Sequence, residues 1–206
     1  MRNLHNTTKQ ELLYFLKSID SKLSRKIIII AIGGTALTLL NLKPSTRDID
    51  FDLPYAKDKN ALTSLFGQLD FEQESFSWFT STGLRIDVFS QGYIFCTQLP
   101  PDYIEKAKVA VKLDNILLKT LSLEDIIITK LGRGDERDFE DIKQIYLHAD
   151  IKNEELAARF FRVAESWTDS PQVIKQKLLD LFEIKFGQWG FSIPIELIKK
   201  VKLWEI

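Results

Sequence analysis

The chain has 206 residues, of which 45% are hydrophobic and 28% charged, and this ordinary globular composition excludes the disordered and fibrous classes. The 28 Lys and Arg residues nearly balance the 29 Asp and Glu residues, so the net charge of -1 provides no basic surface in bulk for a nucleic acid. The single cysteine, Cys96, excludes an internal disulfide, and two histidines argue against a structural zinc site. Any metal chemistry must therefore rely on carboxylates.

The sequence shows no sign of export or membrane insertion. Its N-terminus lacks the apolar segment of a signal peptide. Its most apolar stretch, residues 27–42, is interrupted by glycine, threonine and asparagine, and is shorter than the roughly 20 apolar residues that a membrane span needs. We therefore expect a soluble, cytoplasmic protein with no membrane partner.

The first part of the chain alternates helical and strand patterns. The predicted elements are a helix that begins with a capping box at residues 7–10, a strand buried on both faces at 27–32, a helix at 35–40, a strand of period two at 47–53, and a helix at 57–68. From residue 71 to residue 119 the patterns indicate strands, and beyond residue 121 they indicate helices. The later predicted elements are strands at 76–79, 84–89, 107–111 and 116–118, and helices at 122–131, 136–148, 153–166, 171–186 and 195–202.

This order of elements predicts an α+β fold. We expect a mixed β-sheet flanked by helices in residues 1–120, and a helical C-terminal region, residues 121–206, packed on it. The aromatic residues of the C-terminal helices, among them Phe182 and Phe186, are better explained as a hydrophobic core than as a platform for stacking bases.

Gly33, Gly34 and Thr35 lie at a predicted junction between a strand and a helix. Glycines let the backbone approach a ligand closely, and the first N–H groups of a helix can bind phosphate oxygens. Tight packing between the two elements is, however, the commoner reason for a pair of glycines. Alone, this motif is weak evidence for a phosphate site.

Asp48 and Asp50 lie in the predicted strand of period two. Residues two apart share a face of a strand, so their carboxylates would project together, about 7 Å apart along the strand axis. Adjacent carboxylates repel unless a cation lies between them, and oxygen ligands suit Mg²⁺. A solvated edge strand is the alternative, and Asp52 on the same face slightly favours it.

Asp87 lies in a later predicted strand, where Arg85 and Asp87 occupy the face opposite to the apolar residues. A single acid on a strand is normally a surface residue. Asp87 would gain a role only if its strand lay beside the strand of Asp48 and Asp50.

Taken together, Gly33-Gly34, the Asp48-Ile49-Asp50 segment and Asp87 resemble the signature of the nucleotidyltransferase superfamily with the DNA polymerase β-like palm fold. The resemblance covers residues 27–90. It implies that the Gly-Gly turn with Thr35 holds the triphosphate of an NTP, and it places Arg47 among the nucleotide-binding residues. It also implies that the three aspartates hold two Mg²⁺ ions about 3.5–4 Å apart.

Residues 122–141 resemble a narrower group, the AbiEii-type toxins and their nucleotidyltransferase relatives. In that group a helix carries a lysine, and an Arg-Asp-x-x-Asp segment opens the next helix. The resemblance implies that Lys130 contacts the nucleotide phosphates and that Asp138 is a catalytic residue close to it. The alternative is a helix N-terminus enriched in acids because of the helix dipole, with Arg137 as a surface partner.

The expected activity is Mg²⁺-dependent transfer of a nucleoside monophosphate from an NTP, such as ATP, to an acceptor hydroxyl. The AbiEii-type resemblance suggests RNA, for example a tRNA end, as the acceptor of a toxin that has a cognate antitoxin protein. A small-molecule acceptor, as in antibiotic-modifying relatives, is the first alternative. The second is a non-catalytic nucleotide-binding or antitoxin-like module, against which the intact Asp48, Asp50 and Asp87 argue.

Overall fold

The computed structural model describes residues 6–167 and 169–204. The chain divides into two compact units, the first formed by Met1–Ile94 with Pro101–Ser122 and the second by Phe95–Pro100 with Leu123–Ile206. Within the described ranges, no helix is both long enough and apolar enough to cross a membrane.

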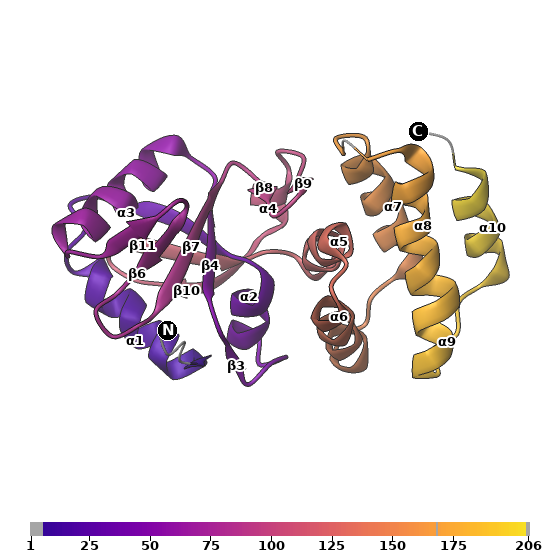
Figure 1. Ribbon diagram of the computed structural model, residues 1–206, viewed down its shortest axis with the longest axis horizontal. Helices are drawn as coiled ribbons and strands as arrows, with labels where there is room; N and C mark the ends of the chain where they lie inside the picture. The colour runs from indigo at the N-terminus through magenta and orange to yellow at the C-terminus, as the bar shows by residue number, and fades with distance from the viewer. Residues whose placement is uncertain (1–5, 168, 205–206) are drawn as a thin grey trace. The chain divides into compact units, whose positions relative to one another are not determined.

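Unit 1 is built on a mixed β-sheet (Figure 1). Along the sheet the strand order is β10 (Lys108–Lys112), β11 (Ile116–Thr120), β2 (Ile27–Ala31), β4 (Ile49–Leu53), β7 (Arg85–Ser90), β6 (Ser77–Phe79) and β5 (Glu72–Glu74). The pairs β11–β2 and β4–β7 are parallel, and the other neighbours on this path are antiparallel. In addition, β8 (Tyr93–Ile94) pairs with β7, while β1 (Thr7–Thr8) and β3 (Ser45–Thr46) form a separate ribbon. The predicted mixed sheet is confirmed.

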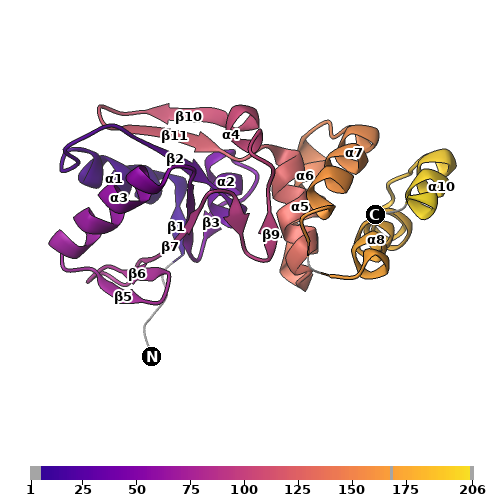
Figure 2. The same cartoon turned by 90° about the horizontal axis from the view of Figure 1, so that it is seen from above.

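Helices flank this sheet. They are α1 (Lys9–Asp20), α2 (Gly33–Leu39), α3 (Ala56–Gln68) and the short α4 (Tyr103–Lys106). Helices α1 and α3 lie side by side, as Figure 2 shows, and the Phe15 and Phe66 rings meet between them with centroids 6.5 Å apart. Phe66 also packs edge-on against Trp78 of β6, at 5.5 Å. The aromatic contacts thus join both helices to the sheet in one hydrophobic core.

The capping box at the start of α1 is displaced by one residue from its predicted position. Thr8 is the N-cap: its hydroxyl accepts from the Glu11 N–H at 3.3 Å, and the Glu11 carboxylate accepts from the Thr8 N–H at 2.8 Å. The prediction of Thr7 with Gln10 was wrong because a charged carboxylate is a stronger acceptor for the N-cap amide than a neutral side-chain amide is. Thr7 instead lies in β1 and is buried.

Strand β4 lies in the middle of the sheet, between β2 and β7. Its apolar residues Ile49, Phe51 and Leu53 are fully buried, as the alternating pattern predicted. Asp50 and Asp52 on the other face are also buried. The alternative of a solvated edge strand is therefore excluded.

Unit 2 is mainly helical. Its helices are α5 (Leu123–Arg133), α6 (Glu136–His148), α7 (Asn153–Ala164), α8 (Pro171–Leu179), α9 (Phe186–Trp189) and α10 (Ile195–Leu203), and it includes the short strand β9 (Thr97–Gln98). A π-helical segment, Asp180–Lys185, joins α8 to α9, so the helix predicted at 171–186 continues to Trp189. Phe182 and Phe186 are buried, which confirms that they belong to a hydrophobic core.

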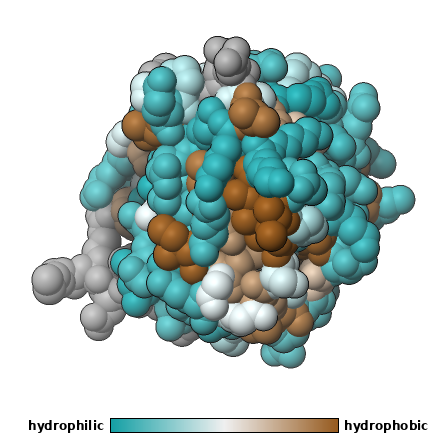
Figure 3. All heavy atoms as spheres, turned by 90° about the vertical axis from the view of Figure 1, so that its right-hand side faces the viewer, coloured by the Kyte–Doolittle hydropathy of each residue, from teal (hydrophilic) through white to brown (hydrophobic). Residues whose placement is uncertain are grey.

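One face of unit 2 carries apolar side chains in a hydrophilic surround. Figure 3 views the side on which α10 lies in Figure 1, and there apolar atoms gather in the middle of the face. The exposed large apolar residues of α10 are Ile195 and Leu203, and Val173 of α8 is about half exposed.

Candidate active site on strands β4 and β7

The parallel pairing of β4 with β7 brings the predicted acids together. Asp50 and Asp87 are direct register partners, and Ile49 and Ile86 are partners one residue earlier. Paired residues on neighbouring strands lie about 5 Å apart and project from the same face of the sheet. The strand of Asp87 therefore lies beside the strand of Asp50, which is the condition for a shared site.

Arg85 binds Asp87 with both ends of its fork. Its Nε donates to Asp87 Oδ1 at 2.9 Å, and its Nη2 donates to Asp87 Oδ2 at 2.7 Å. The two residues are two apart on β7 and so share one face. Asp87 is buried, whereas Arg85 is about a third exposed, so the acid of this bidentate ion pair is better shielded from solvent than the arginine.

The same guanidinium also faces the acids near β4. Arg85 Nη1 lies 3.9 Å from Asp48 Oδ2. Partial burial by itself would lower the pKa of Arg85, but the hydrogen bonds and charge of Asp87, with the charges of Asp48 and Asp50, outweigh it and raise the pKa. Arg85 is therefore a permanent cation among three carboxylates. Arg47, which the family resemblance placed among the nucleotide-binding residues, is exposed.

The carboxylates of Asp48, Asp50 and Asp87 are chemically suited to a divalent metal. No three His, Cys, Asp or Glu side chains converge on a point that would hold an ion in the described part of the chain. At β4 and β7, the Arg85 guanidinium lies among the carboxylates and binds both oxygens of Asp87. In ligand type, carboxylate oxygens are the donors that Mg²⁺ prefers.

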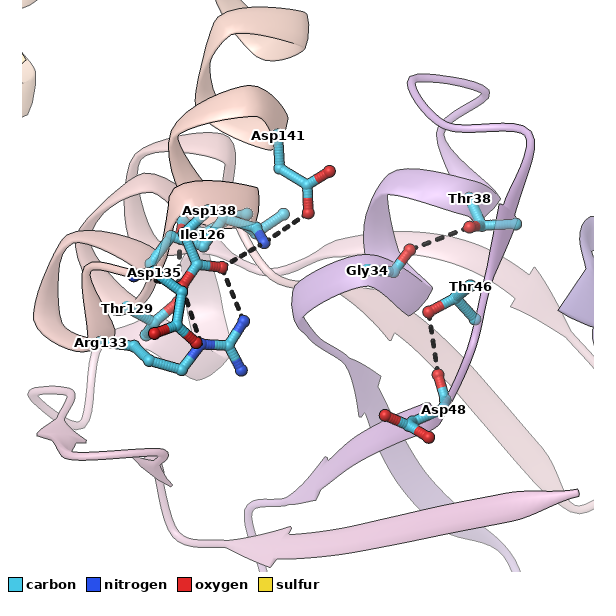
Figure 4. Close-up of polar contacts among 11 residues, drawn as sticks. Gly34, Thr38, Thr46, Asp48, Ile126, Thr129, Arg133, Asp135, Asp138 and Asp141 are labelled. Carbon is cyan, nitrogen blue, oxygen red and sulfur yellow. Dashed lines mark hydrogen bonds and ion pairs between the residues drawn. The ribbon is translucent and has the colours of Figure 1, made fainter. Parts of the chain in front are cut away.

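Two glycines, Gly33 and Gly34, begin helix α2 shortly after β2 ends. Gly33 has φ of 52°, a conformation that L side chains rarely adopt. A Cβ at Gly34 would lie 2.7 Å from the Oγ1 of Thr46, so β3 can approach α2 only because this residue has no side chain. Figure 4 shows Gly34 and Thr46 facing each other. The Thr38 hydroxyl donates to the Gly34 carbonyl at 2.9 Å.

Threonine hydroxyls fix the backbone that carries the acids. Thr35 Oγ1 donates to the Asp48 carbonyl at 3.1 Å and accepts from the Asp50 N–H at 2.9 Å. Thr46 Oγ1 donates to the same Asp48 carbonyl at 3.0 Å, as seen in Figure 4. Thr35 is fully buried, so the group that its side chain positions directly is the Asp48–Asp50 backbone.

Asp52 is a separate buried acid on β4. Its carboxylate accepts from the Tyr103 hydroxyl at 2.6 Å and from the Gly92 N–H at 3.1 Å. Burial raises its pKa to about 6, although these two hydrogen bonds and the charge of Lys59 oppose the shift. Asp52 thereby joins β4 to α4 and to the turn after β7, and sequence reasoning found neither contact.

The predicted residues of unit 2 form a buried ion-pair cluster. Lys130 Nζ lies 3.0 Å from Asp138 Oδ1 and 2.6 Å from Asp141 Oδ2, and the Lys130 and Asp138 side chains are each 1% exposed. Arg133 binds both oxygens of Asp138, at 2.6 and 2.7 Å (Figure 4). Burial alone would raise the pKa of Asp138, but Arg133 and Lys130 hold it below its usual value.

This geometry places Lys130 and Asp138 in direct contact with each other. The cation that binds both oxygens of Asp138 is Arg133, a residue that sequence reasoning did not single out, and Arg137 is exposed. A contact between Lys130 and nucleotide phosphates remains a prediction. A further pair, Arg159 with Asp125, joins α7 to α5 at 2.7 Å and is buried on both sides.

A crystal structure of a candidate nucleotidyltransferase from Thermotoga maritima is similar, with a TM-score of 0.44 and 14% sequence identity over 70% of this chain and 98% of that chain. No curated protein matches the chain, and closeness to the AbiEii-type toxins remains a prediction. A family model described as "Nucleotidyltransferase of unknown function (DUF6036)" matches residues 9–189. Because this match spans most of the sequence, the chain belongs to that family of nucleotidyltransferases.

Proposed function

We propose that the protein transfers a nucleoside monophosphate from an NTP to an acceptor hydroxyl, with Asp48, Asp50 and Asp87 as the ligands of Mg²⁺. The observation that carries the proposal is the register of β4 with β7, which sets Asp50 beside Asp87 while Asp48 faces the same guanidinium. Membership of a nucleotidyltransferase family supports the reaction class.

In this reaction the acceptor oxygen forms a bond to the α-phosphorus of the NTP. The bond between that phosphorus and the oxygen bridging to the β-phosphate breaks, and pyrophosphate leaves with the electron pair. Mg²⁺ supplies neutralisation of the triphosphate charge and a lower pKa for the acceptor hydroxyl. We assign the released proton to Asp87, the carboxylate on the strand beside Asp50.

The other residues serve to position this cluster. The Thr35 and Thr46 hydroxyls hold the Asp48 carbonyl, and Thr35 also holds the Asp50 N–H, so the two carboxylates start from a fixed backbone. Gly33 and Gly34 keep the neighbouring turn free of side chains, which would allow the backbone there to approach a triphosphate closely.

The acceptor that we propose to test first is RNA, in particular a tRNA end, because residues 122–141 resemble the AbiEii-type toxins. The test is to incubate the full chain with Mg²⁺, each α-labelled NTP and total RNA. Label transferred to RNA supports this acceptor and leaves a cognate antitoxin to be sought. Activity that requires a small-molecule hydroxyl supports the alternative acceptor. No transfer to either kind of acceptor indicates a non-catalytic module, which is antitoxin-like if NTP binding is also absent.

The variant that tests the proposed metal ligands is Asp50→Asn. It removes one anionic ligand, so transfer should fall by orders of magnitude, and the rise in Tm produced by Mg²⁺ with NTP should be largely lost. Asp114→Asn is the matched control, since Asp114 is exposed in the turn between β10 and β11. Equal ligand-induced Tm shifts in wild type and Asp50→Asn would contradict the assignment.

A further inference from the structure

The Arg85 guanidinium faces three acids, Asp48, Asp50 and Asp87. It forms two hydrogen bonds to Asp87, at 2.7 and 2.9 Å, so both oxygens of that carboxylate are directed toward the guanidinium. Its remaining nitrogen, Nη1, lies 3.9 Å from Asp48 Oδ2, and its charge also acts on Asp50.

The Arg85 charge reduces the repulsion among these carboxylates in the metal-free protein. Carboxylates held on paired strands repel one another, and that repulsion destabilises the folded state unless a positive group lies among them. Arg85 is suited to this task because its guanidinium stays charged and its fork matches a carboxylate. About a third of its side chain is exposed, so solvent reaches it and the side chain can leave without crossing the core.

The same arrangement conflicts with metal binding. A divalent cation that used Asp87 would lie close to the Arg85 charge, and like charges at that distance repel strongly. The metal would also compete for Asp87 oxygens that already accept hydrogen bonds from Arg85.

We propose that Arg85 is the internal counter-ion of the carboxylate cluster and that it exchanges with the metal: it binds Asp87 in the metal-free protein and releases Asp87 when the metal binds. This inference rests on the proposed function, because it takes Asp48, Asp50 and Asp87 as metal ligands. Arg85 is thus a positioning residue that sets how tightly metal binds and that stabilises the carboxylate cluster of the metal-free protein.

The test compares wild type with Arg85→Gln by titrating the full chain with Mn²⁺ in the absence of nucleotide. Free Mn²⁺ is followed by electron paramagnetic resonance, and Tm is measured with and without metal. Arg85→Gln should bind Mn²⁺ at least about tenfold more tightly, because a positive charge next to the site is removed. Its Tm without metal should fall, and its metal-induced rise in Tm should exceed that of wild type.

Two further variants keep the result interpretable. Arg25→Gln is the matched control, since Arg25 forms an ion pair with buried Asp58 at 3.0 Å elsewhere in unit 1; it should lower the Tm and leave Mn²⁺ affinity unchanged. Arg85→Lys keeps the charge and loses the fork, so its Mn²⁺ affinity should lie between wild type and Arg85→Gln. It also serves as the test variant if circular dichroism shows that Arg85→Gln does not fold.

The outcomes separate this inference from the proposal on which it rests. Mn²⁺ affinity that is equal or weaker in the folded Arg85 variants, with wild type binding Mn²⁺ normally, would overturn the exchange and leave the proposed function standing. Failure of wild type and the Arg85 variants alike to bind Mn²⁺ would refute the three-aspartate metal site itself, and the exchange with it. Tighter binding in Arg85→Gln but not in Arg25→Gln supports the exchange.

Discussion

Asp52 is a carboxylate that its surroundings make hard to ionise. Its pKa rises from 3.8 to about 6 because burial disfavours the charged form more than Tyr103, Gly92 and Lys59 favour it. The folded protein therefore binds the Asp52 proton more tightly than the unfolded chain does. The resulting stabilisation is complete below pH 4 and is lost as the pH rises through 6.

We predict that this residue makes the metal-free protein less stable at pH 8 than at pH 4 by about 3 kcal/mol, the equivalent of its pKa shift. Asp52→Asn should remove this dependence, because an amide has no charge to bury. Urea unfolding in EDTA from pH 4 to pH 8 measures the effect, with Asp114→Asn as the exposed control. The prediction fails if Asp52→Asn keeps the wild-type slope over this range. Asp138, whose pKa is lowered, contributes with the opposite sign but only below about pH 4.

At the scale of single residues, the sequence indicated which acids share a face but not which cation they meet. Period two predicts that Asp48 and Asp50 share a face, whereas a role for Asp87 was implied by the family resemblance. Arg85 shows the same period-two spacing, since it lies two residues before Asp87 on β7. An arginine near an acid is, however, so common on surface strands that this spacing alone does not indicate a functional ion pair. The contact between Asp52 and Tyr103 spans 51 residues of sequence and leaves no local pattern at all.

At the scale of elements, the Thr35 hydroxyl joins α2 to the backbone of Asp48 and Asp50. Thr35 Oγ1 donates to the Asp48 carbonyl and accepts from the Asp50 N–H, and the whole side chain is buried. A buried peptide group that loses its partner costs about 1–3 kcal/mol. The side chain thus links the stability of unit 1 to the placement of two proposed metal ligands.

We predict that Thr35→Val, which keeps the shape and removes the hydroxyl, lowers the free energy of unfolding by about 1–3 kcal/mol and reduces metal-dependent transfer. Thr35→Ser keeps the hydroxyl and should retain most of both. Denaturant unfolding and the labelled-NTP assay measure the two effects. Activity that stays at wild-type level in a destabilised Thr35→Val protein would show that the hydroxyl supports the fold alone.

Long, regular elements were predictable from the sequence, whereas several short ones were not. The helix over α6 was predicted at its observed bounds, Glu136–His148, because its apolar residues recur at helical spacing. Helix α4 has four residues and β5 has three, too few to show a period. The missed α4 explains why Tyr103 was not considered as a partner for an acid in the sheet.

Across the whole molecule, both units contain ion pairs with a buried acid, and in unit 2 some of these pairs are buried on both sides. In unit 2, Arg159 donates to Asp125 at 2.7 and 3.1 Å, and both side chains are almost fully buried. Removing one member of such a pair leaves a charge in a poorly solvated place, which costs more than the pair itself contributes.

We therefore predict that Asp125→Ala lowers the free energy of unfolding by about 3–5 kcal/mol. The control is Asp150→Ala, because Asp150 pairs with Lys152 at the surface, where such pairs contribute little. Thermal unfolding followed by tryptophan fluorescence compares the two. Similar Tm values for Asp125→Ala and Asp150→Ala would contradict a structural role for the buried pair.

The strand order of unit 1 ends in two edges of opposite charge. At one end β10 carries Lys108 and Lys112, and at the other β5 carries Glu72 and Glu74, all of them exposed. An edge strand can template pairing with the same strand of another copy, which is a route to aggregation. Two copies that met through the same edge would bring like charges face to face, so the pattern discourages symmetric self-association. Because these charges are exposed, salt screens them, and the protection weakens as the ionic strength rises.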